Sequence, residues 1–91
     1  MALTKETIVD KIEVMEMGQV QVRTATRVLE DGVALSSSFH RHVVEPSTKS
    51  GDTWADTDIS GEDARVQAVA NATWTDSVKT AYQEMIDAQA L

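Results

Sequence analysis

The sequence contains no cysteine and only two histidines. Without thiols the chain has no disulfide to staple it and no thiolate ligand for a structural zinc ion. A chain that lacks cysteine folds in the same way in oxidising and reducing compartments, so this absence leaves the compartment open. A small fold built from this chain therefore has no internal cross-link to depend on.

Large apolar side chains are also scarce. The 91 residues include one phenylalanine, one tyrosine and two tryptophans. At this length, folding buries only about 60% of the surface that the unfolded chain exposes. We therefore expect one thin core, and a domain this lean often completes its burial against a copy of itself or against another protein.

Basic residues are outnumbered, with 8 lysines and arginines against 15 acidic residues and a net charge of −7. Such a chain repels the phosphate backbone of nucleic acids at long range. The amino-terminal residues show no secretory signal, and no stretch approaches the roughly 18 apolar residues that a membrane span requires. We therefore expect neither nucleic acid nor a membrane as a partner.

Apolar and β-branched residues alternate with polar ones from Thr7 to Glu45, which is typical of strands. We expect a three-stranded antiparallel meander over residues 6–45. The predicted apolar rows are Ile8, Ile12 and Val14 in the first strand; Val20, Val22, Thr24, Thr26 and Val28 in the second; and Val33, Leu35, Ser37, Phe39 and Val43 in the third.

Turn chemistry predicts how these strands pair. Asp31-Gly32 favours a two-residue hairpin turn, because a type I′ turn needs positive φ at both central positions. The register counted from this turn pairs Val28 with Leu35, Thr24 with Phe39 and Arg23 with His40. For the first turn we expect an odd-numbered loop of three residues, 17–19, which pairs Val14 with Val22.

The rest of the chain predicts a loop and two helices. Pro46 ends the third strand, and residues 46–60 form a polar loop without periodicity. Capping residues and helical spacing then predict helices over about 61–74 and 76–90, with Ser60 as the first cap. The fold class that follows is α+β, with a three-stranded antiparallel β-meander, a long loop and two C-terminal α-helices in a single domain, 1–91.

His40 and His42 lie two residues apart on a predicted strand, so both imidazoles face the same way. They are ordinary exposed sheet residues unless further ligands complete a metal site. A stable site needs three or four ligands, and this chain has no third histidine. Three copies around an axis would supply six nitrogens, which is the one route to metal that the pair leaves open.

The predicted register places Arg23, Arg27, His40 and His42 on one sheet face as a basic and polar patch. This patch is either solvated or docks onto an acidic surface of a neighbouring protein. Trp54 stands alone in an acidic loop, where it is either an anchor for a partner or folds back over its own helices. We predict that these five residues are the contacts of an assembly module.

Motifs for catalysis and cofactors are missing or incomplete. The sequence has no nucleophile elbow, no phosphate-binding glycine loop and no acid–base pair at a spacing that sets it in a pocket. Asp56, Asp58 and Gly61 resemble the start of a calcium loop, but Gln67 stands where a bidentate glutamate is required. We therefore predict no enzymatic activity, no cofactor and no small-molecule substrate.

Four segments together resemble a family of small proteins encoded by tailed bacteriophages, especially aquatic ones: residues 21–26, 30–33, 38–43 and 58–75. The resemblance covers nearly the whole chain and assigns a role to none of its residues. It implies a virion protein made in the host cytoplasm, and we predict a component of the tail, baseplate or fibre. A head decoration protein and an intracellular effector that binds a host protein are the alternatives.

Overall fold

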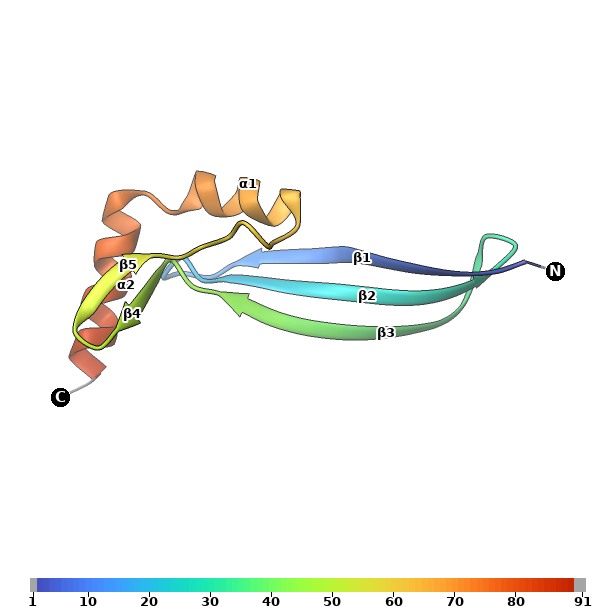
Figure 1. The fold of residues 1–91 in the computed structure, drawn as a ribbon, viewed down its shortest axis with the longest axis horizontal. Coiled ribbons are helices and arrows are strands. Elements are labelled where there is room, and N and C mark those ends of the chain that lie inside the picture. The colour runs from blue at the N-terminus through green and yellow to red at the C-terminus, as the bar shows by residue number, and fades with distance from the viewer. Residues whose placement is uncertain (1, 90–91) are drawn as a thin grey trace.

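The computed structural model describes residues 2–89 and has the predicted α+β fold (Figure 1). Its elements are β1 (Leu3–Val14), β2 (Val20–Glu30), β3 (Val33–Val44), β4 (Ser47–Ser50), β5 (Thr53–Asp56), α1 (Ala64–Thr73) and α2 (Asp76–Gln89). The first three strands form an antiparallel meander, and β4 pairs with β5 in a second, small sheet. Residue 90, the predicted end of the second helix, lies outside the described residues.

The molecule is an elongated arm attached to a small head. We call β1, β2 and β3 the arm, and the segment from β4 to α2 the head. The principal extents are 58 × 25 × 21 Å, and Figure 1 shows the head gathered at one end of the arm. The hairpin between β2 and β3 lies at the far end, away from both helices.

The core lies where the head meets the arm. Its buried residues are Val20, Val22, Val44 and Val66, and around them pack the partly buried Val9, Ile12, Ile59, Val69 and Trp74. Four valines make a small core, as the shortage of large apolar residues predicts. The core also covers only one face of the arm, because Val20 and Val22 point to the same side of β2.

A β-bulge in β1 changes which of its residues share a face. The pairing with β2 shifts between Val9 and Lys11, which leaves Asp10 as the extra residue. Because a bulge inverts the alternation beyond it, Ile8 lies on the opposite face from Ile12 and Val14. The prediction that these three residues share one face is therefore wrong.

A second shift overturns the predicted register of β2 and β3. Asp31 and Gly32 have φ of 51° and 84°, as the predicted turn requires. Beyond Leu29 and Ala34, however, Leu35 has no partner and Val28 pairs with Ser36. From there on every pair differs by one residue from the prediction.

In the observed register, Phe39 and Val43 of β3 do not share a face with the apolar row of β2. Phe39 pairs with Ala25, and His40 pairs with Thr24. Phe39 and Val43 therefore lie on the face opposite to Val20 and Val22. The turn residues fix the start of a hairpin register, but a bulge beyond the turn resets it.

The turn between β1 and β2 is longer than predicted. Val14 pairs with Val20, so the loop has five residues, 15–19, and the predicted pairing of Val14 with Val22 is wrong. The prediction of an odd number of loop residues is confirmed, and this number keeps Val14 and Val20 on the same face. Gly18, at φ 87°, and the hydrogen bond from its N–H to the Met15 carbonyl form the turn.

The segment predicted to be a long loop contains the β4–β5 hairpin, with Gly51 in its turn at φ 61°. Helix α1 begins at Ala64, three residues later than predicted. Its cap is Asp63, whose carboxylate accepts a hydrogen bond from the Arg65 N–H. Ser60 is therefore not the cap, and its own N–H donates to Asp58.

The turn at Gly18 supports the joint between arm and head, so it tests the fold. A Cβ at this position would lie 2.5 Å from Val78 Cγ1 and 3.1 Å from Pro46 Cγ. At Gly32, which has a similar φ, a Cβ would meet no atom within 4 Å. Gly32→Ala therefore carries only the backbone strain, about 1–2 kcal/mol.

We expect Gly18→Ala to destabilise the fold by about 1–3 kcal/mol more than Gly32→Ala does, because overpacking against Val78 and Pro46 adds to the backbone strain that both variants carry. Urea unfolding of both variants measures the difference. Equal losses of unfolding free energy would show that the turn does not pack against α2 and Pro46.

Candidate interaction surface

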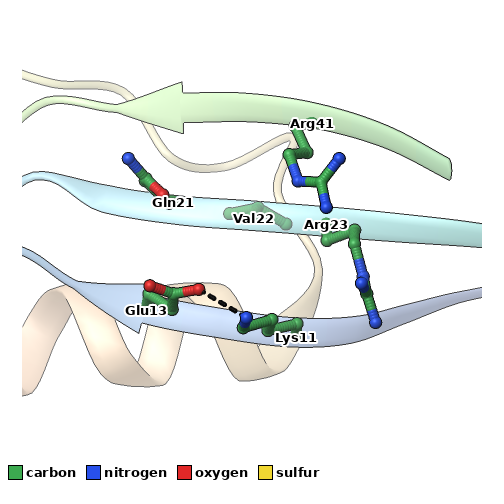
Figure 2. Close-up of a pocket in the computed structure, with 6 residues that line it drawn as sticks. All are labelled: Lys11, Glu13, Gln21, Val22, Arg23 and Arg41. Atoms are coloured by element: carbon green, nitrogen blue, oxygen red, sulfur yellow. Dashed lines mark ion pairs between the residues drawn. The ribbon is translucent and has the colours of Figure 1, made fainter.

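The arm has a covered face and an open face. The covered face is the one with Val20 and Val22, on which α1 packs. The open face is the opposite one, and the pairing assigns to it Glu6, Ile8, Lys11 and Glu13 of β1, Gln21, Arg23, Ala25 and Arg27 of β2, and Ser37, Phe39, Arg41 and Val43 of β3. Figure 2 shows how Arg41 reaches from β3 toward β2, and Arg23 from β2 toward β1.

A cluster of ion pairs crosses the open face. Arg23 donates two hydrogen bonds to the Asp10 carboxylate, at 2.9 and 2.8 Å. Arg27 lies 3.7 Å from Asp10 and 3.6 Å from Glu6. The two predicted contact arginines are therefore together on one face, and acidic partners from β1 hold both of them.

The bulge in β1 makes this cluster possible. It turns Asp10 toward the open face, where its hydrogen bond with Arg23 lowers the pKa of the Asp10 carboxyl. On the opposite side, Arg65 of α1 donates a hydrogen bond to the Val9 carbonyl next to the bulge. The bulge thus links the open face, through Asp10, to the head, through the Val9 carbonyl.

An apolar row crosses the three strands beside the ion pairs. Ile8 pairs with Ala25, and Ala25 pairs with Phe39. Ala25 is fully buried beneath its neighbours, whereas Ile8 and Phe39 are 37% and 51% exposed. The Arg23 guanidinium lies 4.4 Å above the centre of the Phe39 ring, a cation–π arrangement that holds this ring over β2.

The two histidines lie on the other face. His40 pairs with Thr24 and His42 with Val22, so both belong to the covered face, and their ring centres are 6.3 Å apart. The predicted patch that joins them with Arg23 and Arg27 is therefore divided between two faces. This correction follows directly from the shifted register.

His42 already has a partner, because its Nε2 lies 2.7 Å from a Glu62 carboxylate oxygen. Among residues 2 to 89, no three metal-binding side chains come together as a metal site would require. A metal site shared between three copies would first have to break the contact between His42 and Glu62. The structure therefore favours a role for His42 in joining the arm to the head.

Trp54 lies in the head and packs against α2. Its ring meets Tyr82 edge to face at 6.1 Å, and its indole N–H donates to Asp87 at 3.3 Å. Lys49 reaches the same carboxylate at 2.7 Å. In the structure Trp54 therefore folds back over a helix of its own chain, which is the second of the two predicted interpretations.

The hollow between the charged side chains of the arm is too small for a small ligand. The hollow in Figure 2, beside the ion pair of Lys11 and Glu13, has a volume of about 20 Å³. Ligand pockets usually measure roughly 300–1,000 Å³, so this hollow holds at most a water molecule.

Within residues 2–89, no helix has the length and apolar character of a membrane span.

No family model matches the chain, and neither a curated protein nor a solved structure is significantly similar to it.

Sequence reasoning missed Asp10, Ile8 and Phe39 as members of the open face. A signal for the bulge was present, because the adjacent apolar pair Ile8-Val9 and the adjacent charged pair Asp10-Lys11 interrupt the period of two. No comparable interruption marks the second bulge, where Leu35 is followed by three serines.

The Asp10–Arg23 pair makes the stability of the arm depend on pH. A carboxyl whose pKa is lowered on folding stabilises the fold above its unfolded pKa, and this contribution is lost as pH falls through the folded pKa. We therefore expect Asp10→Asn to lower the melting temperature at neutral pH. The difference from the unmodified protein should shrink between about pH 5 and about pH 2.

Circular dichroism melts over this pH range measure the effect, with Asp52→Asn in the exposed β4–β5 turn as the control. A constant difference between Asp10→Asn and the unmodified protein at every pH would contradict the ion-pair account.

Proposed function

We propose that the chain is a non-enzymatic assembly protein that binds other protein chains through its arm. One observation carries this proposal. Nine large apolar side chains are exposed in the described residues, and all of them lie in β1, β2, β3 or the turn after β1: Leu3, Ile8, Val14, Met15, Val28, Val33, Leu35, Phe39 and Val43. They lie on both faces of the arm, with Ile8, Phe39 and Val43 on the open face. A concentration of exposed apolar side chains in one part of a molecule is typical of a binding site for protein.

The chemistry of the open face supports the same role. Arginine and aromatic residues are enriched where proteins bind one another, and here Arg23 stacks on Phe39 in the middle of the arm. The ion pairs with Asp10 and Glu6 hold the arginines in place before any partner arrives. A surface ordered in advance loses less conformational entropy on binding.

The resemblance to small proteins of tailed bacteriophages supports a place in the virion. A tail, baseplate or fibre component is the first candidate, and a head decoration protein is the second. An intracellular effector that binds a host protein would use the same arm. The partners of a virion protein would be other virion chains, including copies of this one.

Mass spectrometry of purified particles, from the phage that encodes the chain, tests the virion role. We expect the chain at a fixed ratio to the major structural proteins through repeated density-gradient purification. Its absence from particles, together with its presence in infected cells, would contradict this role and favour the effector.

A pair of matched substitutions tests whether the arm makes the contact. We expect Ile8→Lys, on the open face, to reduce incorporation into particles by about tenfold or more, because a charge replaces an apolar contact. Ala88→Lys, on the exposed side of α2, is the control and should be incorporated normally. Equal incorporation of both variants, with unchanged circular dichroism, would show that the arm is not the contact surface.

A further inference from the structure

The three-stranded sheet ends in two edges, formed by β1 and β3. Along each edge, the outward backbone N–H and C=O groups face away from the sheet, ready to pair with another strand. Residues 33–41 of β3 are all exposed. The edges therefore offer a second means of binding, distinct from the open face itself.

The edge formed by β1 is protected against pairing. Five charged residues lie along it: Lys5, Glu6, Asp10, Lys11 and Glu13. The bulge at Asp10 also interrupts its regular spacing. Charges and bulges are the usual means by which proteins prevent a sheet edge from pairing with another chain.

The edge formed by β3 lacks this protection. Arg41 is its only lysine, arginine, aspartate or glutamate, and it contains no proline. Its one irregularity, at Leu35, lies near the tip of the arm. The segment from Ser36 to Val43 is therefore a regular strand with a free edge.

We propose that β3 pairs antiparallel with β3 of a second copy of this chain, about a twofold axis at Phe39. Two arms then form one continuous six-stranded sheet. This inference deepens the assembly role proposed above and rests on it, because it names the partner of the arm.

The sequence of β3 fits itself in this arrangement. Phe39 lies opposite the partner's Phe39, and aromatic pairs across strands are favourable. The row Ile8–Ala25–Phe39 then continues through the same three residues of the second copy, in reverse order. Ser37 lies opposite the partner's Arg41, so no residue of the segment meets a like charge directly.

Charge opposes contact between two copies elsewhere on the surface more than at this edge. The chain carries a net charge of −7, so two copies repel each other over most of their surface. The free edge of β3 carries no carboxylate between Val33 and Val44. The two Arg41 side chains begin four residues apart along the paired strands, about 13 Å, which exceeds the Debye length of about 8 Å at physiological salt.

Sedimentation velocity over a range of concentrations tests the dimer, with Phe39→Lys and Leu3→Lys as matched variants. Both replace an exposed apolar residue by lysine, on β3 and β1 respectively. We expect Phe39→Lys to weaken the dimer at least about tenfold, because two like charges meet at the axis. Leu3→Lys should leave it unchanged, and a monomer at all concentrations, or equal effects of both variants, would overturn the proposal.

Disulfide trapping tests the pairing without altering Phe39. Because the chain has no cysteine, each single cysteine variant forms only disulfides between copies. A mixture of Ser37→Cys and Arg41→Cys should give a covalent heterodimer on oxidation, whereas neither variant alone should cross-link. A Ser37→Cys homodimer would overturn the axis at Phe39, because those residues lie about 13 Å apart in the proposed pairing.

These outcomes separate the inference from the proposed function. A chain that is monomeric in solution but present in purified particles would refute pairing through β3 and leave the assembly role standing. A dimer trapped at the expected positions, in a protein absent from particles, would refute the virion role and leave the pairing standing.

Discussion

The head covers only part of one face of the three-stranded sheet, because α1 is shorter than the strands beneath it. Helix α1 has 10 residues and spans about 15 Å, whereas β1 and β3 have 12 residues each and extend for about 40 Å. Val66 completes a core with Val20 and Val22 at one end of the arm, and the remaining sheet has no helix over it. This mismatch exposes part of the covered face, whereas the open face and the edge of β3 are exposed because α1 packs on the opposite face.

Two bulges decide what the uncovered sheet presents. The one at Asp10 turns a carboxylate toward Arg23 and Arg27 on the open face. The one at Leu35 moves Phe39 to that same face, where Arg23 stacks on it. Without these extra residues the alternation would collect the apolar side chains on the covered face, where the short α1 could not shield them all.

The fold was predictable from local signals, but its register was not. Alternating residues and Asp31-Gly32 predict the meander, and helical spacing predicts α1 and α2, because each signal lies within a few residues. The adjacent pairs Ile8-Val9 and Asp10-Lys11 signal the first bulge, but no local pattern marks the one at Leu35, which sets the register of β3. The β4–β5 hairpin escaped prediction because its two strands are four residues each and mostly polar.

The candidate surface was predictable in part for the same reason. Arg23 and Arg27 are two strand positions that share a face in any register, and they do lie together. Their assignment with His40 and His42 required the register across two strands, which the bulge at Leu35 altered. The position of Trp54 depended on Tyr82 and Asp87, whose places follow from tertiary packing alone.

Amide hydrogen exchange in the assembled and the dilute protein tests most directly whether the arm is the assembly surface. The account predicts that assembly slows exchange in β3, chiefly over residues 36–43, while α1, α2 and the β1 edge exchange at unchanged rates. Protection that appears in the head, around Trp54 and α2, with none along β3, would contradict it.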